Sequence, residues 1–351
     1  MIKVGVVGAS GWAAGSHLPV LTGLPEFEVT AVATTRQNSA DDVAAAFGVR
    51  HAFASARALT AHPDVDLVVV SVKVPEHAAV IRDALAAGKH VVSEWPLGVS
   101  AEEARELTEA ATEAGVLHGI VLQGYHSPDA AFVADLLAAG RIGEIESVSV
   151  VAAGDPFGGG TLPEALEWSL DPAAGSSILT IMAGHFLATV ERIAGRWREV
   201  TAQLPRLHEQ VRVAGTGRTV PNQQPSHVLV RGRLESGAEA SVTVHGGGHS
   251  PEGFLLKFVG SEGVLTATAA TPGMYMHWTD WAVAVDGEPV SFTRPPEQGP
   301  NVRISALYKE IAQAIADGRQ PHPSFETALR HHRLLASIEL SARTGLPQAI
   351  R

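Results

Sequence analysis

The stretch MIKVGVVGASGWAAG, residues 1–15, decides the fold of this chain of 351 residues. Residues 2–7 form a largely apolar run, as expected of a parallel strand that is covered on both faces. A turn containing Gly8 and Gly11 follows, and a helix is expected over residues 13–24. A strand, a glycine turn and a helix in this order are typical of the first unit of a βαβ fold.

The same alternation continues to about residue 122. Strands are expected at 27–33, 51–53, 65–72, 90–93 and 117–122, and helices at 39–47, 56–61, 77–87 and 101–114. Strands that alternate with helices of this length form a doubly wound parallel sheet with right-handed crossovers. We therefore predict an N-terminal Rossmann domain over residues 1–122.

The pattern changes after residue 123. Helices are expected at 128–139, 177–193, 301–316 and 324–344, and strands at 142–153, 227–234, 239–245, 254–259 and 263–268, with a Gly/Pro-rich loop at 154–163. Runs of strands with a few helices indicate an α+β domain over residues 123–351, built on a large, open-faced, mostly antiparallel sheet. The predicted class is α/β, with the site in the cleft between two domains.

The composition excludes several classes of partner and of catalytic site. The chain has 26 Lys and Arg against 37 Asp and Glu, a net charge of −11, which argues against nucleic acid or an anionic membrane as the main partner. It has no cysteine, which excludes disulfides, thiolate nucleophiles and Cys-ligated zinc. The first residues are too short for a signal sequence, and we identify no apolar run near the ~18–20 residues that span a bilayer. We expect a cytoplasmic protein.

The glycine turn is a candidate cofactor loop. Counted from Gly8 as the first glycine of G-x-G-x-x-G, Ser10 and Ala13 stand at the second and third positions, with Gly11 and Trp12 between them. Backbone N–H groups at a helix start attract a pyrophosphate, and small residues let it approach. The alternative is a tight βα turn without a ligand. The strand–helix alternation behind the loop favours dinucleotide binding.

The end of the second expected strand indicates which dinucleotide. A carboxylate that binds the ribose of NAD is expected near Thr34, but the chain has Thr34, Thr35 and Arg36 there. These side chains can donate hydrogen bonds to a 2′-phosphate, which a carboxylate would repel. We therefore expect NADP rather than NAD, the alternative being that Arg36 is an ordinary solvated residue.

Longer motifs support a family resemblance. With the glycine loop, the stretches AAGKHVVSEWPL (86–97) and GRIGEI (140–145) and the pair Gly175 and His185, the chain resembles the Gfo/Idh/MocA superfamily over nearly its whole length. It is most similar to the subgroup around the fungal galactose-regulon repressor, a non-catalytic NADP-binding relative. The resemblance implies a Rossmann domain plus an open-faced sheet that often mediates oligomers. It also places Glu94 and Trp95 at the cofactor.

Two departures from the superfamily pattern affect the chemistry. Trp95 stands where the superfamily usually has a lysine beside the nicotinamide, and its ring offers stacking on nicotinamide or a sugar but no charge. Ile181 stands where an aspartate usually precedes the catalytic histidine by four residues. His185 itself is retained, at the position of the group that takes or gives a hydroxyl proton. A lone histidine in an apolar helix is otherwise a core residue.

Other residues are candidates to complete a site. Lys73 follows a buried strand, where it would return a cation to the nicotinamide, or be a solvated lysine. Tyr125, a possible proton donor, and His126 follow the last Rossmann strand and either line the cleft or pack at the domain junction. Trp168 and Asp171 lie in a segment that often touches substrate in the superfamily. We expect no metal site at His245 and His249, because they lack further ligands at suitable spacing.

Two functions follow from these observations. The first is an NADP-dependent oxidoreductase of the Gfo/Idh/MocA type that acts on CH–OH groups of a sugar, sugar derivative or polyol, with His185 as the acid/base. The second is a non-catalytic NADP-binding sensor or regulatory protein, which would explain both Trp95 and Ile181. For either, we expect a homodimer or a tetramer built from dimers, because an open sheet face tends to be buried by another subunit.

Overall fold

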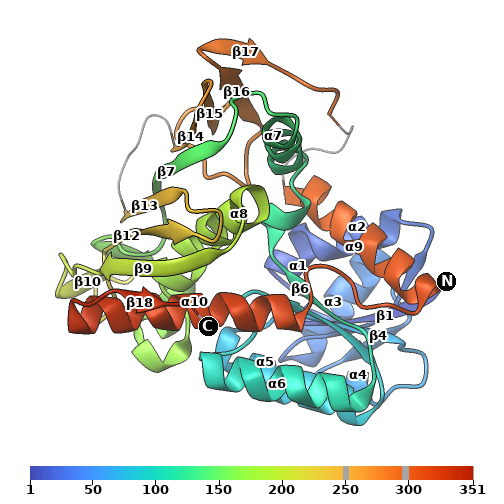
Figure 1. Cartoon of the computed structure of the whole chain (residues 1–351). Helices are drawn as coiled ribbons and strands as arrows, with labels where there is room; N and C mark the ends of the chain where they lie inside the picture. The colour runs from blue at the N-terminus through green and yellow to red at the C-terminus, as the bar shows by residue number, and fades with distance from the viewer. Residues whose placement is uncertain (248–252, 295–299, 351) are drawn as a thin grey trace. The chain divides into compact units, whose positions relative to one another are not determined.

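The computed structural model describes residues 1–247, 253–294 and 300–350 (Figure 1). The chain divides into two compact units. Unit 1 consists of residues 1–123 and 300–332, and unit 2 of residues 124–299 and 333–351. The expected division after residue 122 treats all that follows as one domain, whereas residues 300–332 belong to the first unit.

Unit 1 is built on a six-stranded sheet whose strands all pair in parallel. The strands are β1 (Ile2–Val7), β2 (Phe27–Ala33), β3 (His51–Phe53), β4 (Leu67–Val70), β5 (His90–Glu94) and β6 (His118–Val121). Their order is β3-β2-β1-β4-β5-β6, so the direction of winding reverses between β1 and β4. This is the doubly wound order of dinucleotide-binding domains, and ligands bind at such a reversal. The predicted Rossmann fold is confirmed.

The helices of unit 1 lie between these strands, with one difference from expectation. They are α1 (Trp12–Gly15), α2 (His17–Gly23), α3 (Gln37–Phe47), α4 (Ala56–Thr60), α5 (Val74–Ala86) and α6 (Ala101–Ala114). The single helix expected over 13–24 is interrupted at Ser16, whose backbone is not helical. Pro19 explains the break, because a proline cannot donate to the carbonyl four residues earlier and is tolerated only in the first turn of a helix. The second helix therefore starts again at His17.

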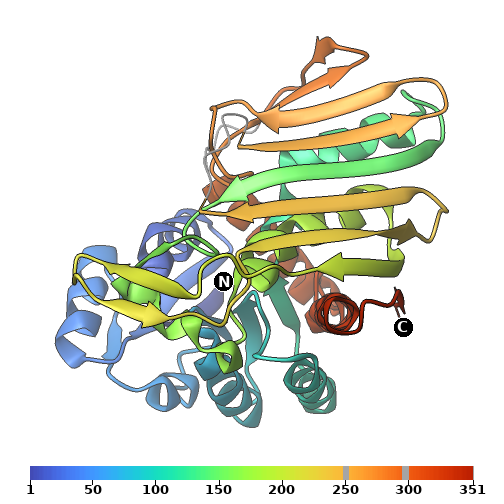
Figure 2. The same cartoon turned by 90° about the vertical axis from the view of Figure 1, so that its left-hand side faces the viewer.

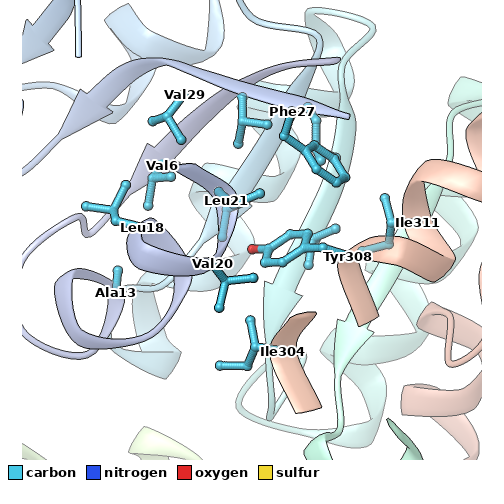
Figure 3. Close-up of a cluster of buried hydrophobic side chains, with 14 of the residues drawn as sticks. Val6, Ala13, Leu18, Val20, Leu21, Phe27, Val29, Ile304, Tyr308 and Ile311 are labelled. Atoms are coloured by element: carbon cyan, nitrogen blue, oxygen red, sulfur yellow. The ribbon is translucent and has the colours of Figure 1, made fainter. Parts of the chain in front are cut away.

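Helix α9 (Pro300–Asp317) completes the core of unit 1. Its residues Ile304, Tyr308 and Ile311 are fully buried and belong to the same hydrophobic cluster as Leu21 and Phe27 (Figure 3). The ring of Tyr308 meets that of Phe27 edge to face at 5.5 Å. The C-terminal part of the chain thus closes one face of the N-terminal sheet.

Unit 2 holds a nine-stranded mixed sheet of order β17-β16-β15-β14-β7-β13-β12-β9-β18. Its strands are β7 (Ile145–Gly154), β9 (Trp197–Gln203), β12 (His227–Leu234), β13 (Glu239–Gly246), β14 (Phe254–Gly260), β15 (Val264–Ala269), β16 (Trp281–Val285), β17 (Glu288–Val290) and β18 (Gln348–Ala349). Only β13 and β7 pair in parallel among the neighbours within this described sheet. The large, mostly antiparallel sheet predicted from the sequence is confirmed.

Helices cover one face of this sheet. The helical segments from residue 123 onward, apart from α9, are η1 (Gln123–His126), α7 (Pro128–Ala138), η2 (Glu164–Leu170), η3 (Pro172–Ala174), η4 (Ile178–Ala183), α8 (Gly184–Ala194) and α10 (Phe325–Thr344), of which residues 325–332 belong to unit 1. A small second sheet joins β11 (Thr219–Pro221), β10 (Gln210–Ala214) and β8 (Thr161–Pro163). In Figure 2 the helices α7 and α8 lie behind the large sheet, and the described residues place no helix in front of it. On that open face Val151 is 48% exposed.

The helix expected over 177–193 consists of two kinds of helix. Residues 178–183 form a π-helix, and α8 continues from Gly184. By length and composition alone, the stretch Pro172–Ala194 would suffice to cross a membrane, whereas no such stretch was expected from the sequence. However, 78% of its most apolar part is buried inside the protein. A buried core helix of a soluble protein has the same composition, so this stretch is weak evidence of a membrane span.

Candidate functional site

The glycine loop lies where three strands of unit 1 end. Gly8 follows β1, and its amide donates a hydrogen bond to the carbonyl of Ala33 at the end of β2 (2.9 Å). A Cβ atom at Gly8 would lie 2.1 Å from the carbonyl oxygen of Ser71, directly after β4, and Gly8 has a φ of +80°. Both observations require glycine at this position. The loop therefore sits at the reversal between β1 and β4, where ligands bind in this fold.

The outer side of the same loop is open. Gly11 has a φ of +57°, and a Cβ atom built on it would meet nothing within 4 Å. Ser10 is exposed, whereas Ala13 is fully buried beneath the loop. The loop thus combines a tight inner turn with free space outside it, which fits the approach of a pyrophosphate to backbone N–H groups. These residues fit the dinucleotide cofactor that the fold implies.

The residues expected to select the cofactor follow β2. The Thr34 hydroxyl donates a hydrogen bond to the Arg36 carbonyl (2.8 Å), which stabilises the turn into α3. Thr35 and Arg36 are exposed. The guanidinium of Arg36 makes no ion pair with the part of the chain that the structure describes. Thr34 therefore has a structural role, while Thr35 and Arg36 have side chains accessible to a ligand.

Glu94 and Trp12 are hydrogen-bonded to each other. The carboxylate oxygen Oε1 of Glu94, at the end of β5, accepts from the indole nitrogen of Trp12 (2.8 Å) and lies 2.5 Å from Nε2 of His17. Because a carboxylate only accepts, His17 donates to it through Nε2, and the other ring nitrogen of His17 is hydrogen-bonded to the Tyr308 hydroxyl (2.7 Å). Burial and the nearby Glu94 carboxylate raise the pKa of Tyr308 well above its usual range. This chain of bonds holds the cofactor loop against β5 and α9.

Neither His17 nor Tyr308 was predicted from the sequence as part of this site. His17 lies four residues after Ala13 of the glycine loop, and this closeness in the sequence was the available signal. Tyr308 lies almost three hundred residues away in the chain, and no local pattern connects it with the glycine loop.

Trp95 lies in a buried cluster of histidines. It is 4% exposed, and its ring packs against those of His331 (4.8 Å) and His332 (4.6 Å) at the start of α10. Burial lowers the pKa of His332 to about 3, so this imidazole is neutral. Little of the indole surface is therefore accessible for stacking on a ligand, and no positive charge comes from His332 to replace the missing lysine.

His77 links the loops that follow β4 and β5. It is buried at the start of α5, with Nδ1 2.8 Å from the carbonyl oxygen of Pro96 and Nε2 3.1 Å from that of Val72. Lys73, in the loop that follows β4, is exposed and precedes the first residue of α5. The expected cation thus lies at the carboxyl edge of the sheet, on the side of the cofactor loop.

In unit 2, His185 lies at the start of α8, directly after the π-helix. Ser177 caps that π-helix through a reciprocal pair of bonds with Thr180. π-Helical turns of this kind occur frequently at functional sites. His185 is 9% exposed, and its ring meets that of His277 edge to face, with centroids 4.6 Å apart and planes at 83°. His185 is thus one member of a pair of imidazoles.

The loop between β15 and β16 supplies the second imidazole. His277 is 4% exposed, and the Tyr275 ring lies 5.1 Å from it. The Tyr275 hydroxyl donates to the Met182 carbonyl in the π-helix (3.0 Å), and burial raises the pKa of this phenol well above its usual range. Neither Tyr275 nor His277 was predicted from the sequence as a site residue. The dense run MYMHW at 274–278 was the only available signal.

The other expected residues of unit 2 lie near α8 or in the segment before it. Tyr125 and His126 are half-buried in η1, which approaches α8 so closely that a Cβ atom on Gly124 would lie 2.0 Å from the Thr189 hydroxyl. Thr189 in turn donates to the His185 carbonyl (2.8 Å). The structure thus brings Tyr125 and His126 to the helix that carries His185.

Trp168 and Asp171 lie further along the chain, in η2 and directly after it. The Asp171 carboxylate accepts from the Ala173 amide (2.9 Å) and so caps η3. The neighbouring residues Ser169 and Leu170, together with Ser177 and Gln224, line a cavity of about 20 Å³, enough for one water-sized group. Asp171 therefore has a structural role in its own segment.

The sequence predicted no metal site at His245 and His249. His245 on β13 pairs with His227 on β12, their rings 4.6 Å apart, while His249 lies outside the described residues. Within residues 1–247, 253–294 and 300–350, no three His, Asp or Glu side chains are grouped so that they could hold a metal ion.

Comparison with known proteins agrees with this architecture. Residues 2–121 match the family model described as an oxidoreductase family with an NAD-binding Rossmann fold, and residues 128–269 match the model of the Gal80p C-terminal domain. The chain belongs to the Gfo/Idh/MocA superfamily. Its members here include both enzymes and regulators, so membership alone does not decide between the two functions.

The relatives of this superfamily member are of both kinds. The galactose/lactose metabolism regulatory protein GAL80 of Kluyveromyces lactis is 27% identical over 255 residues, which are 67% of this chain and 56% of that protein. The dehydrogenase aclE of Aspergillus oryzae is 32% identical over 213 residues, 57% of each chain. The chain thus spans somewhat more than half the length of these curated relatives.

A solved structure shows the same fold over the full length. Levoglucosan dehydrogenase in complex with NADH and levoglucosan superposes with a TM-score of 0.84 over 99% of both chains, at 20% sequence identity. At this identity the likeness concerns the fold alone. The two chains therefore share one fold over nearly their whole length.

Proposed function

We propose that this chain is an oxidoreductase that prefers NADP and transfers a hydride between the nicotinamide and a CH–OH carbon of a sugar, sugar derivative or polyol. The observation that carries the proposal is the environment of His185. The ring of this histidine contacts a second imidazole, and the helix that carries it directly continues a π-helix. Such a group suits the transfer of a hydroxyl proton.

Cofactor binding is assigned to the carboxyl edge of the unit 1 sheet. Gly8, Ser10, Gly11, Trp12 and Ala13 would hold the pyrophosphate, because the loop is tight inside and open outside. The bond from Trp12 to Glu94 fixes the loop in this form. When bound, the nicotinamide supplies the hydride chemistry, which no side chain can provide.

The preference for NADP is assigned to the residues after β2. The exposed side chains of Thr35 and Arg36 can donate to a 2′-phosphate, and no carboxylate follows β2 to repel it. Thr34 would act through the turn that it stabilises. Structural relatives bind NADH, so NAD remains the competing cofactor in the titration below.

The proton chemistry is assigned to His185, with Lys73 and Tyr125 as further catalytic candidates. Lys73 is exposed at the sheet edge, and Tyr125 lies in the segment next to α8. For substrate contact we propose His126, Trp168, Asp171 and His185. Trp95 would act mainly by shaping the pocket wall, because only 4% of its surface is exposed.

A non-catalytic NADP-binding sensor is the second candidate. It is favoured by Trp95 and Ile181, which remove two charged groups of the superfamily pattern, and by the GAL80 relatives. A regulator needs only to bind the cofactor and a partner protein, so both losses would cost it nothing.

One experiment distinguishes the two functions. The purified chain is first titrated with NADPH and NADH, and then nicotinamide reduction is followed with saturating NADP⁺ across a panel of sugars, nucleotide sugars and polyols. We expect tighter binding of NADPH and turnover of at least one panel member. His185→Ala should reduce that turnover by ~10²–10⁴-fold and leave NADPH affinity unchanged. His208→Ala, a half-buried histidine elsewhere in unit 2, is the matched control.

Tight NADPH binding without turnover of any panel member would refute the enzyme and favour the sensor.

For assembly we propose a homodimer or a tetramer built from dimers, formed through the open face of the nine-stranded sheet, where Val151 is exposed. We propose a cytoplasmic location and a small carbohydrate as the ligand, and with a net charge of −11 we propose no nucleic-acid partner.

A further inference from the structure

We infer that His17 and Tyr308 are positioning residues for the cofactor. Through the Glu94 carboxylate they fix the side chain of Trp12 in the glycine loop, and so they strengthen the binding of a dinucleotide. The inference deepens the proposed function and rests on its cofactor site, but not on turnover. Helix α9, from the C-terminal part of the chain, thereby becomes a working part of that site.

Glu94 is the centre of this series of hydrogen bonds. It is the last residue of β5, at the carboxyl edge of the sheet, and its side chain is 16% exposed. Its atom Oε1 lies 2.8 Å from the indole nitrogen of Trp12 and 2.5 Å from Nε2 of His17. A carboxylate oxygen only accepts, so both nitrogens donate to it. The carboxylate therefore cannot turn away without breaking both bonds.

His17 connects Glu94 with α9. Its side chain is fully buried, and Nδ1, the ring nitrogen that does not face Glu94, is hydrogen-bonded to the Tyr308 hydroxyl (2.7 Å). In Figure 3 this hydroxyl points from α9 toward α2, where Val20 and Leu21 are labelled. Because both nitrogens of the imidazole are bonded, the ring is held in one orientation and Nε2 is directed at Glu94.

The position of Tyr308 is fixed by the core of unit 1. The residue is fully buried, and its ring packs against that of Phe27. Just after α9, the Gln320 side chain accepts from the His118 amide (3.0 Å) and donates to the Val116 carbonyl (2.9 Å), at the start of β6. The helix is thus attached to the sheet at two places, and the Tyr308 hydroxyl is a firm end point for the series of bonds.

At the other end of the series, Trp12 belongs to the loop that would hold the pyrophosphate. Its carbonyl accepts from the Ser16 hydroxyl (2.6 Å), and its indole is bonded to Glu94. Ordering a loop on binding costs free energy, so a loop that is already held in place binds more tightly. The pyrophosphate is common to NADPH and NADH, and both cofactors should gain equally.

Tyr308→Phe is the most specific test, because it removes the hydroxyl and keeps the ring in the core. We expect the Kd values of NADPH and NADH to rise equally, by about 3- to 10-fold in a fluorescence titration, the scale of one hydrogen bond. Thr30→Val is the matched control. It removes another fully buried hydroxyl of unit 1, which is bonded to the Asp64 carbonyl before β4, at the opposite edge of the sheet, and both Kd values should stay unchanged.

Two amide variants of His17 test the middle of the series. In His17→Gln the side chain is long enough to place an N–H group where Nε2 lies, so the bond to Glu94 is kept and Kd should rise by less than about threefold. In His17→Asn the shorter side chain reaches only the place of Nδ1, and the bond to Glu94 is lost. We expect Kd for both cofactors to rise by about 10- to 100-fold, the scale of losing a supporting residue behind a binding group.

The indole N–H of Trp12 gives a reading without any cofactor. The chain has six tryptophans, and the Trp12 signal in a ¹H–¹⁵N spectrum of the full-length protein is identified by its loss in Trp12→Phe. In Tyr308→Phe we expect this signal to shift and its hydrogen to exchange faster with solvent, because the Glu94 carboxylate is held less firmly. In Thr30→Val the signal should stay where it is in the wild type.

Unchanged Kd values, or an unchanged Trp12 signal, in Tyr308→Phe would refute the inference. A rise in Kd for NADPH alone would contradict it as well, because the effect would then lie at the 2′-phosphate. If Tyr308→Phe does not fold, the His17 variants decide, and equal Kd values in His17→Gln and His17→Asn would refute the inference. A wild type that binds neither cofactor would instead refute the proposed function, so the two failures are distinguishable.

Discussion

His332 makes the stability of the protein sensitive to acid, and His332→Phe should remove part of that sensitivity. The imidazole is 5% exposed and packs against Trp95 at 4.6 Å. Its Nε2 atom has no hydrogen-bond partner within the described parts of the chain. Phenylalanine keeps a ring against Trp95 and removes this buried nitrogen.

The magnitude follows from the shift of the pKa. Burial first, and then the nearby His331 and His77, lower the pKa of His332 from 6.5 to about 3. A histidine whose pKa is lowered by folding stabilises the folded protein, and the whole of this contribution is present above pH 6.5, the pKa in the unfolded chain. The contribution is lost as the pH falls toward 3, the pKa in the folded protein. Relative to pH 8, the loss is about 2 kcal/mol at pH 5 and about 3 kcal/mol at pH 4.

Urea unfolding followed by tryptophan fluorescence at several pH values measures this contribution. The difference in unfolding free energy between His332→Phe and wild type should grow in favour of the variant from pH 8 to pH 4. Other histidines with a lowered pKa, such as His118, are present in both proteins, so the difference isolates His332. His208→Gln removes a half-buried imidazole of unit 2, outside this cluster, and should leave the acid slope unchanged. Parallel pH profiles for wild type and His332→Phe would refute the reasoning.

Four further perturbations have defined outcomes. Arg36→Ala should weaken NADPH by about 1.5–3 kcal/mol in a fluorescence titration and leave NADH unchanged, and an equal loss for both would contradict the assignment. Gly8→Ala should abolish cofactor binding in the same titration, because its Cβ would lie 2.1 Å from the Ser71 carbonyl, whereas Gly15→Ala, with nothing within 4 Å, should bind normally. Trp95→Lys should lower the unfolding free energy by about 3–5 kcal/mol in urea, because it replaces a buried ring with a charge, and an unchanged midpoint would show that the ring is not packed. Val151→Arg should convert a dimer to a monomer in sedimentation, while Leu207→Arg, which is exposed outside the large sheet, should not, and a monomeric wild type would contradict the proposed interface.

Much of the fold could be predicted because its signals are local. The apolar run of β1, the glycine turn and the regular return of strands determine a doubly wound sheet, since each element follows from the burial pattern of a few neighbouring residues. The positive φ of Gly8 is also local, because it belongs to a turn between one strand and one helix, whereas the close approach of the Ser71 carbonyl depends on the pairing of β1 with β4. The expected and observed bounds of the long helices α6 and α9 differ by at most one residue at each end. The break at Ser16 was not predicted, because residues 13–24 have the pattern of one continuous helix and the effect of Pro19 was not considered.

The candidate site depended far more on tertiary structure. The sequence alone placed His185, Glu94 and Trp12 near a site and identified the loss of two charged groups. Only the structure paired His185 with His277, joined Glu94 to His17 and Tyr308, and returned residues 300–332 to the N-terminal unit. A pattern in the sequence reflects interactions among a few neighbouring residues. A contact between residues far apart in the chain depends instead on how whole helices and strands pack. Such packing is determined by the summed fit of many side chains, and no short stretch of sequence contains it.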